Sequence, residues 1–366
     1  MRQKQVPSHR PGGGGRPLCA PSTSTSAGAT RDHDENFRSC DLVIVRRSFL
    51  GALVAGLIAL PRAGRAQQPR RIWRIGYLVP TREAPTAPVI RALGEVGYVD
   101  GQNVTLVVRT AADDFARLPT LAAELAQAKV DIILAVAPPA IRAAGQATKT
   151  IPIVMAYWGG PDLIESGTIV SFARPGTNVT GVYMLASELE GKRLELLIEA
   201  VPSARRMAML NPGSAQGERL DELRSVAAAG HIDLSVSAIP ASKDYLPVFE
   251  EMARDRIEAV LVPSFPRFYV ERREIIEAAA RYHLPAIYEW GDMARDGGLL
   301  AYGPDSLELN RLVARYVDRI LKGASPRDLP VAQPTKFELV VNLRTARALN
   351  LVIPQSVLLR ADEVIP

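Results

Sequence analysis

Short apolar runs alternate with amphipathic stretches along the chain from residue 71 onward. The runs are rich in β-branched residues and predict buried strands, while apolar residues at helical spacing predict helices between them. The expected strands of this first series are 72–79, 103–109, 131–137, 151–157 and 179–184, and the expected helices are 87–96, 118–128 and 140–148. A loop-rich passage over 159–178 precedes the last strand. Continuous apolar strands separated by helices are typical of parallel βαβ units covered on both faces.

A second series of the same kind follows the first. Its expected strands are 206–210, 233–239, 259–262 and 285–289, and its expected helices are 188–200, 217–229, 246–254 and 270–282. The tail then predicts strands over 299–302 and 337–341 and helices over 306–321 and 344–349. These late elements belong to neither series, which indicates that the chain crosses back between two lobes.

The pattern therefore predicts an α/β protein with two doubly wound parallel-sheet lobes, a hinge and a central cleft. We expect lobe 1 to comprise 71–185 plus about 303–330, and lobe 2 to comprise about 186–302 plus 331–366. With 366 residues, the chain is long enough to give each lobe its own core.

The formal net charge of +5 comes from the head of the chain. Residues 1–66 carry 10 of the 44 basic and 4 of the 39 acidic residues, which leaves 34 basic and 35 acidic residues in the remainder. A basic footprint for nucleic acid is therefore missing from the predicted lobes, and we expect no nucleic-acid partner.

Cysteine and histidine follow the same division. Cys19 and Cys40 both precede residue 66, so the predicted lobes contain no thiol for catalysis, disulfides or metal binding. Beyond the head, His231 and His283 lie in separate predicted segments and form no cluster with metal-ligand spacing. We expect neither a metal nor a cofactor.

The N-terminal region reads as an extension followed by an export signal. Residues 1–44 are rich in Gly, Pro, Ser and Arg and are expected to be disordered or to precede the true translation start near Val45. Residues 45–66 combine an arginine pair, a short apolar run and small residues at the end, as in a twin-arginine signal peptide. Val45 replaces the usual polar residue, so the general secretory route stays open. Ten to twelve apolar residues are too few for a membrane anchor, and we expect cleavage near Ala66 and a periplasmic protein.

Five short motifs in the predicted lobes carry a resemblance to a known family. They read GYVDGQNV at 97–104, ARPGTNVTG at 173–181, LPAIYE at 284–289, PTKFELVVN at 334–342 and LRADEVI at 359–365. In this order they resemble the ABC-transporter substrate-binding proteins that include the tryptophan/tyrosine-type binding proteins, with the type I periplasmic-binding fold. The resemblance implies a periplasmic, monomeric receptor that delivers a small organic solute, such as an amino acid, to an ABC permease in the cytoplasmic membrane.

In open α/β sheets, ligands bind beyond the carboxyl ends of the strands, and this rule selects the candidate ligand-binding residues. They are Pro80, Thr81, Pro138, Pro139, Tyr157, Trp158 and Asp162 in lobe 1, Asn211, Ser264, Phe265, Tyr288 and Glu289 in lobe 2, and Tyr302 and Asp305 at the return crossover.

An amino acid needs donors for its carboxylate, a carboxylate for its ammonium group and an apolar wall. Backbone N–H groups at a helix start, such as Pro139–Ala140, are candidates for the first. Asp162, Glu289 and Asp305 are candidates for the second, and the aromatic candidates together with Trp290 for the third.

Each candidate also has an ordinary structural explanation. Pro138 and Pro139 suit the first turn of a helix, and Asp305 before Ser306 suits a helix N-cap. The aromatic side chains suit core or lobe-interface packing equally well.

Two other classes of function compete with solute transport. A two-lobed α/β enzyme would share the architecture, but no strand is followed by a G-x-G-x-x-G turn or a P-loop, and G-x-S-x-G is absent. We therefore expect no enzyme. An extracytoplasmic ligand sensor that partners a membrane receptor would share both the fold and the export signal, so the sequence leaves that alternative open.

Overall fold

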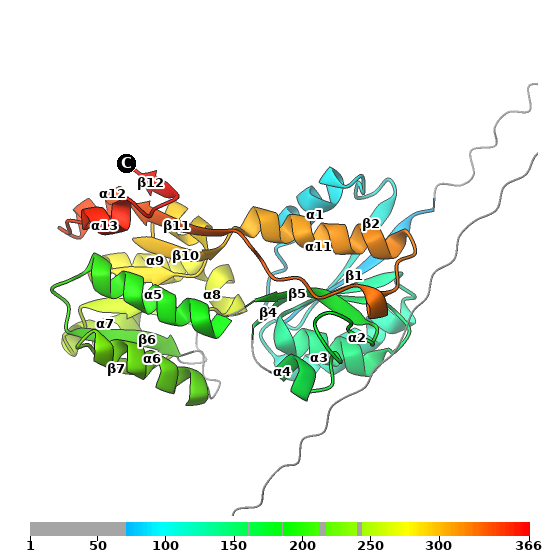
Figure 1. The fold of residues 1–366 in the computed structure, drawn as a ribbon, viewed down its shortest axis with the longest axis horizontal. Coiled ribbons are helices and arrows are strands. Elements are labelled where there is room, and N and C mark those ends of the chain that lie inside the picture. Colours follow the sequence, from blue (N-terminus) through cyan, green and yellow to red (C-terminus); the bar gives the residue numbers. More distant parts are fainter. Residues whose placement is uncertain (1–70, 160–161, 185, 212–216, 240–243) are drawn as a thin grey trace, which may run out of the picture. The chain divides into compact units, whose positions relative to one another are not determined.

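The computed structural model describes residues 71–366 except 160–161, 185, 212–216 and 240–243 (Figure 1). By its contacts the chain divides into residues 1–68 and residues 69–366, and the description below concerns the second unit. The predicted extension, 1–44, and the predicted signal peptide, 45–66, lie outside the described residues. Within the described part, no helix has the length and apolar character needed to cross a membrane.

The first lobe is built on a five-stranded parallel sheet with strand order β2-β1-β3-β4-β5. Its strands are β1 (Trp73–Val79), β2 (Val104–Thr110), β3 (Ile132–Val136), β4 (Ile153–Gly159) and β5 (Val179–Met184). Its helical segments are α1 (Thr86–Glu95), η1 (Phe115–Arg117), α2 (Leu118–Gln127), α3 (Ala137–Ala147) and α4 (Asp162–Glu165). Alternate residues of β1 face opposite layers: Ile75, Tyr77 and Val79 pack with α1, whereas Leu78 packs with α2 and α3.

The second lobe is built on a seven-stranded sheet with strand order β12-β11-β10-β9-β8-β6-β7. Its strands are β6 (Arg206–Asn211), β7 (Asp233–Ala238), β8 (Ala259–Leu261), β9 (Ala286–Tyr288), β10 (Leu300–Pro304), β11 (Phe337–Asn342) and β12 (Glu363–Ile365). Its helices are α5 (Ala186–Ala200), α6 (Gly217–Ala229), α7 (Leu246–Arg254), α8 (Pro266–Val270), α9 (Arg272–Arg281), α10 (Gly291–Arg295), α12 (Leu343–Ala348) and α13 (Gln355–Leu358). All neighbouring strands are parallel except β10 and β11, which pair antiparallel.

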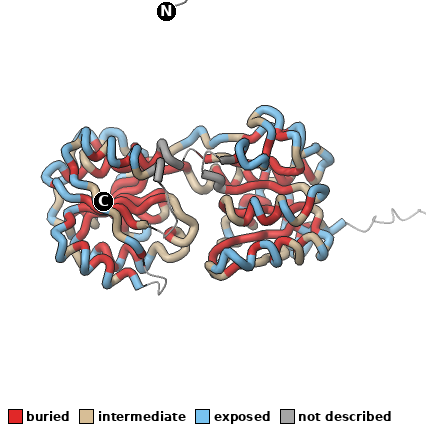
Figure 2. The backbone as a smooth tube through the Cα atoms, turned by 90° about the horizontal axis from the view of Figure 1, so that it is seen from below, coloured by how far each residue is buried: buried red, intermediate tan, exposed pale blue. Residues whose placement is uncertain are grey.

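Each sheet is sandwiched between helices, and Figure 2 shows the buried strands as a red layer within each lobe. In the second lobe, Met207 and Met209 of β6 pack with α5 and α6, while Ala208 and Leu210 face the layer that contains α7 and α9. The predicted class, α/β with two doubly wound lobes, is confirmed by this arrangement.

The long helix α11 (Ser306–Leu321) follows β10 of the second lobe but packs on α1, β4 and β5 of the first (Figure 1). After η2 (Pro326–Asp328), the chain runs along the edge strand β5 on its way back to β11. Thr180 Oγ1 donates to the carbonyl oxygen of Leu329 at 2.7 Å, and the Ala332 N–H donates to the carbonyl of Gly181 at 2.9 Å. The late elements therefore join the two lobes.

Three local expectations differ from the structure. The expected helix 270–282 is α9, which begins two residues later because Glu271 has non-helical geometry, and the short helix α8 before it, which Pro266 starts at its N1 position, was not expected. Helix α3 begins three residues before the expected start at 140, since Pro138 and Pro139 are tolerated in a first turn. The expected loop over 159–178 contains the short helix α4.

Gly303 allows β10 to lie very close to the end of β9. A Cβ atom added at Gly303 would lie 2.0 Å from the carbonyl oxygen of Glu289, which no real side chain permits. The backbone that carries Glu289 is therefore fixed by a residue just before the crossover into α11.

Asp305 is the N-cap of α11. Its Oδ1 accepts from the N–H groups of Leu307 and Glu308 at 3.0 and 3.2 Å, and Lys336 Nζ lies 2.6 Å from Oδ2. Partial burial acts to raise the pKa of Asp305, but the hydrogen bonds from Lys336 and the helix N–H groups hold it below its ordinary 3.8.

We predict that Gly303→Ala lowers the free energy of unfolding by about 1–3 kcal/mol, because the methyl group overlaps rigid backbone. Gly94→Ala is the matched control, because Gly94 lies in α1 and the added methyl group would have no atom within 4 Å. This substitution should raise the free energy of unfolding by about 0.5–1 kcal/mol. Urea unfolding of both variants measures the difference. A fully stable Gly303→Ala variant would contradict the close approach of β10 to β9.

We predict that Asp305→Asn keeps the cap but lowers the free energy of unfolding by about 0.5–1 kcal/mol at pH 7, because the carboxylate charge is lost. Since the folded-state pKa of Asp305 is depressed, its contribution is present above pH 3.8 and is lost as the pH falls through the lower folded value. Unfolding curves at pH 7 and at successively lower pH should therefore converge for wild type and variant. A constant difference at all pH values would show that the charge is irrelevant.

Candidate functional site

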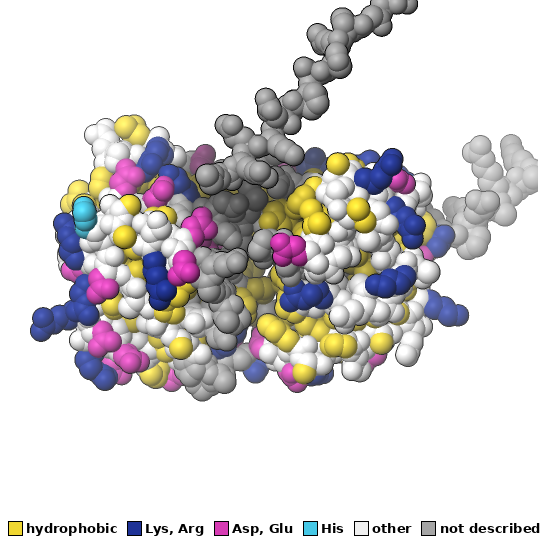
Figure 3. Space-filling view, turned by 60° about the horizontal axis from the view of Figure 1, so that its bottom comes forward, with side chains coloured by type: hydrophobic (Ala, Val, Ile, Leu, Met, Phe, Trp, Pro, Cys, Tyr) yellow, Lys and Arg dark blue, Asp and Glu magenta, His cyan; other side chains and the backbone are white. Residues whose placement is uncertain are grey.

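A pocket of about 440 Å³ is lined by residues of both lobes. Its residues cluster at the carboxyl ends of β1, β3, β8 and β9 and on the helices that follow these strands. Figure 3 shows hydrophobic side chains along the side of the first lobe that faces the second. The carboxyl ends of parallel strands therefore converge on one cavity, as the rule for open α/β sheets requires.

The first lobe contributes a wall that is mostly apolar. Its lining residues are Tyr77, Val79, Pro80, Thr81, Pro85, Pro88, Phe115, Val136, Ala137, Pro138, Pro139, Arg142 and Met184. The prolines and aromatic rings offer flat surfaces, and Arg142 on α3 supplies a positive charge. Ala137 has a φ of 64°, in the left-handed region, so the turn from β3 into α3 is strained beside the pocket.

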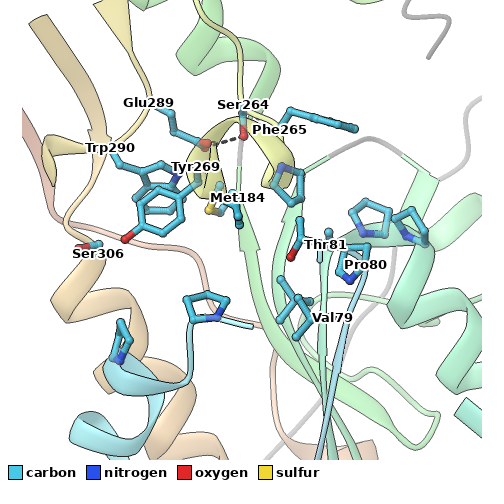
Figure 4. A pocket seen from close by; sticks show the side chains of 18 of the residues that line it. Val79, Pro80, Thr81, Met184, Ser264, Phe265, Tyr269, Glu289, Trp290 and Ser306 are labelled. Atoms are coloured by element: carbon cyan, nitrogen blue, oxygen red, sulfur yellow. Dashed lines mark hydrogen bonds between the residues drawn. The ribbon is translucent and has the colours of Figure 1, made fainter. Parts of the chain in front are cut away.

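The second lobe contributes two carboxylates and aromatic rings, and Figure 4 labels the rings of Phe265, Tyr269 and Trp290. Its lining residues are Ser264, Phe265, Pro266, Tyr269, Val270, Glu289, Trp290 and Asp292, and α11 adds Ser306 and Asn310. The rings of Tyr269 and Trp290 meet edge to face, with centroids 6.0 Å apart and an interplanar angle of 72°. This geometry gives a stable aromatic surface.

Glu289 lies at the end of β9 and is almost fully buried. Ser264 Oγ donates to Glu289 Oε1 at 2.5 Å, as drawn in Figure 4, and Arg193 Nη2 lies 3.8 Å from the same oxygen. A buried carboxylate costs free energy unless it is hydrogen-bonded and paired, and these two contacts supply both conditions. Glu289 is thus held as a charged group at the pocket wall.

Asp292 is the second carboxylate and sits at the start of α10. It accepts hydrogen bonds from Tyr269 at 3.3 Å, from Ser306 at 3.2 Å and from Arg295 at 3.1 Å. Burial and the nearby Asp292 charge raise the pKa of Tyr269 to about 12, so its hydroxyl is neutral and can donate. Burial also raises the pKa of Tyr77 well above its ordinary value, with the nearby Tyr269 adding to the shift.

The pocket lining includes seven of the residues predicted as ligand contacts. They are Pro80, Thr81, Pro138, Pro139, Ser264, Phe265 and Glu289. The lining also includes Trp290, which was named as a candidate for the apolar wall. These residues come from separate strand ends and meet because the strands run parallel. Whether each touches a ligand stays a prediction.

Other predicted contacts lie elsewhere. Tyr288 is buried in the core, where Gly298 packs against its ring, and burial raises its pKa. Tyr302 stacks on Phe337, with ring centroids 6.3 Å apart, and Asp305 caps α11. Asn211 ends β6 and is not part of the lining. The side chains of Tyr157, Trp158 and Asp162 lie outside the described residues.

The pocket also includes residues that the strand-end rule did not select. Arg142, Tyr269, Asp292 and Asn310 lie on the helices α3, α8, α10 and α11, and each is several residues beyond the end of the preceding strand. Helical spacing was the available signal, because Pro138 and Arg142 are four residues apart on α3. A search that extended over the first two turns of each following helix would have included them.

Within the described residues, no group of three or more His, Cys, Asp and Glu side chains has the arrangement of a metal site. The pocket offers aromatic surfaces, two carboxylates on the side of the second lobe and a guanidinium on the side of the first.

Comparison with known proteins agrees with the observed fold. Residues 79–365 match the family described as ABC transporter substrate binding protein. The tyrosine-binding protein of Clostridioides difficile (strain R20291) is 26% identical over 264 residues, which cover 72% of this chain and 75% of that protein.

Two solved structures are also similar. The ABC domain in complex with L-Trp from Streptococcus pneumonia has a TM-score of 0.69 at 24% identity, covering 80% of this chain and 99% of that chain. A conserved domain protein from Vibrio cholerae O1 biovar eltor str. N16961 has the same TM-score and coverage at 25% identity. The family match covers most of the chain and confirms the predicted resemblance, so this chain belongs to the ABC transporter substrate-binding protein family.

Proposed function

We propose that the protein captures an aromatic amino acid, or a close relative of one, in the pocket between its lobes and hands it to an ABC permease in the cytoplasmic membrane. The observation that carries this proposal is the pairing of an aromatic and proline-rich wall with two carboxylates in one pocket. A volume of about 440 Å³ lies within the range of small-molecule sites.

The charges in the pocket favour a zwitterion over a simple acid or a neutral sugar. Glu289 and Asp292 lie on the second-lobe side and suit an ammonium group, whereas Arg142 lies on the first-lobe side and suits a carboxylate. The start of α3 is a poorer carboxylate site than its position alone predicts, because Pro138 and Pro139 have no N–H to donate. Arg142 takes that role in the proposal.

The side chain of the ligand would lie against Tyr269, Trp290, Phe265 and the prolines of the first lobe. Aromatic faces and proline rings bind flat apolar groups well, and Trp and Tyr rings also attract an ammonium group. Relatives support this chemistry: one is a tyrosine-binding protein, and one similar structure is a complex with L-Trp.

Binding would act by bridging the two lobes. A ligand that contacts carboxylates on one lobe and a guanidinium on the other binds the closed form more tightly than the open form, so it shifts the population towards closure. The permease would then distinguish loaded from empty protein by the relative position of the lobes. We propose that the protein works as a monomer, and that it is a transporter component and not an enzyme.

Members of this family work outside the cytoplasm. We propose that residues 45–66 direct export to the periplasm, since they contain the arginine pair, apolar run and small residues of a cleavable signal. The predicted result is a mature N-terminus close to Gln67, measured by N-terminal sequencing of protein recovered from the periplasm. Recovery of an uncleaved chain in the membrane fraction would contradict this proposal.

We predict that calorimetric titration of the purified protein detects binding of L-tyrosine, L-tryptophan or L-phenylalanine. Tyramine lacks the carboxylate, 4-hydroxyphenylpropionate lacks the ammonium group, and L-alanine lacks the ring. Each omission should weaken binding about tenfold or more, because each removes one of the three contacts proposed for the ligand: with the guanidinium of Arg142, with the carboxylates, or with the aromatic wall. Equal binding of tyrosine and alanine would contradict the aromatic wall, and tight binding of a sugar would contradict the whole proposal.

The same calorimetric titrations can be repeated with the Glu289→Gln variant. It should weaken binding of the amino acid by about tenfold to a hundredfold, since a charge-assisted contact contributes about 1.5–3 kcal/mol. Binding of 4-hydroxyphenylpropionate, which has no ammonium group, should change little. Glu195→Gln is the matched control, because Glu195 is exposed on α5, where it pairs with Lys192, and is not part of the pocket lining.

A further inference from the structure

The hydroxyl of Tyr77 is a buried polar group at the pocket. Tyr77 lies on β1, is only 1% exposed, and belongs both to the core of the protein and to the lining of the pocket. Within the described residues its hydroxyl makes no hydrogen bond, and its pKa is raised by burial and then by the charge of Tyr269. The hydroxyl is therefore neutral near pH 7 and can donate. A buried donor without an acceptor costs free energy, so a ligand that supplies an acceptor here is favoured.

On the second-lobe side of the pocket, the hydroxyl of Tyr269 already donates its proton. It donates to Asp292 Oδ2 at 3.3 Å, and Ser306 Oγ donates to the same oxygen at 3.2 Å. Asp292 is also paired with Arg295, whose Nη1 lies 3.1 Å from Oδ1. A carboxylate in an ion pair only accepts hydrogen bonds, so the proton of Tyr269 is directed to Asp292 and its oxygen can accept a hydrogen bond from a ligand.

The two hydroxyls together favour one kind of ligand group. They lie near each other, because the charge of Tyr269 acts on the pKa of Tyr77. A carboxylate or carbonyl only accepts and an ammonium or indole N–H only donates, whereas a hydroxyl does both. A ligand hydroxyl can accept from Tyr77 and donate to Tyr269, which continues the chain of hydrogen bonds to Asp292. Hydrogen bonds in such a chain polarise and strengthen one another.

This hydroxyl pair lies apart from the carboxylate of Glu289. In Figure 4 the hydroxyl of Tyr269 points toward Ser306 and away from Glu289, which is hydrogen-bonded to Ser264. The ring of Tyr269 and its edge-to-face partner Trp290 form the aromatic surface of this wall. A ligand that uses the whole wall therefore carries an ammonium group at one end, a flat ring and a hydroxyl at the far end of the ring.

We propose that Tyr77 is a specificity-determining residue: its hydroxyl donates to a hydroxyl on the aromatic ring of the ligand, and that hydroxyl donates to Tyr269. The ligand class is therefore hydroxyphenyl amino acids, in preference to phenylalanine and tryptophan. This inference rests on the proposed function, because it selects among the aromatic amino acids. Asp292 then acts on the ligand through Tyr269, and Glu289 is the partner of the ammonium group.

The first test compares two ligands on matched proteins by calorimetric titration. Wild type should bind L-tyrosine about tenfold to a hundredfold more tightly than L-phenylalanine, which leaves the hydroxyl of Tyr77 unpaired. In Tyr77→Phe, which removes only that hydroxyl, the ratio of the two affinities should fall about tenfold, with tyrosine bound more weakly and phenylalanine more tightly. An unchanged ratio in Tyr77→Phe would overturn the inference.

Tyr98→Phe is the matched control for that substitution. The hydroxyl of Tyr98 donates to Asp318 at 3.2 Å, and Tyr98 is not part of the pocket lining. Tyr98→Phe should therefore keep the wild-type preference for tyrosine. A loss of preference equal to that of Tyr77→Phe would show that removing any buried tyrosine hydroxyl has this effect, and would overturn the inference.

The second test uses the ligand-free protein. Tyr98→Phe loses a hydrogen bond and should raise the unfolding equilibrium constant about twofold to tenfold in urea. Tyr77→Phe should leave that constant unchanged or lower it, because the hydroxyl that it removes has no partner in the described protein. If Tyr77→Phe unfolds as readily as Tyr98→Phe, the hydroxyl of Tyr77 is engaged within the protein and the inference is wrong.

The outcomes for the wild type separate this inference from the proposed function. If tyrosine and phenylalanine bind equally well, the proposed function stands and the inference is overturned. If neither binds, the proposed function fails, and the inference is decided by tyramine and 2-phenylethylamine, which differ only in the ring hydroxyl. Tighter binding of tyramine, lost in Tyr77→Phe, would support it. Equal binding of these two amines, or binding of neither, would overturn it.

Discussion

All strands of a parallel sheet end on the same edge, and this constraint determines where the protein can bind anything. At the carboxyl end of a buried strand the chain turns, and backbone polar groups are no longer paired within the sheet. Polar side chains and the first turns of helices therefore lie there. In this chain β1, β3, β8 and β9 all end at the pocket. The antiparallel strand β11 runs the other way, and its terminal Asn342 caps α12 and bonds the carbonyl of Ala294, away from the pocket.

Much of the fold could be predicted from sequence because the signal is local. The run that becomes β5 contains β-branched residues and follows turn residues, and its limits were predicted correctly. Helix α11 was also predicted at its correct limits, since Asp305 and the apolar periodicity both act within a few residues. The short elements were harder. Helices α8 and α10 have five residues each, too few for a period to be visible, and their stability comes from packing in the layer above β8 and β9.

The site was only partly predictable because it depends on distances between strand ends. The strand-end rule located Glu289 and Ser264, since Glu289 directly follows β9 and Ser264 lies in the turn that follows β8. It also selected Tyr288, whose side chain points into the core because alternate residues of a strand face opposite ways. Arg193 carried no such signal: on α5 it reads as an ordinary exposed helix residue, and only the tertiary structure places it between two carboxylates. Long-range electrostatics of this kind cannot be recovered from one sequence.

The two walls of the pocket differ in how much side-chain conformational entropy ligand binding would remove from them. Five of the six prolines in the lining belong to the first lobe, and a proline ring has no rotamers to freeze when a ligand arrives. The second lobe instead presents long and rotatable groups, among them Phe265, Tyr269 and Glu289, whose ordering costs about 0.5–1.5 kcal/mol each unless they are already held. The hydrogen bonds to Glu289 and Asp292 provide that restraint in advance. The first-lobe wall is thus rigid because of its proline rings, and the second-lobe wall is rigid because of its hydrogen bonds. Ligand specificity would therefore change more easily through the second lobe, where a single substitution can remove a hydrogen bond and free a side chain to adopt another rotamer.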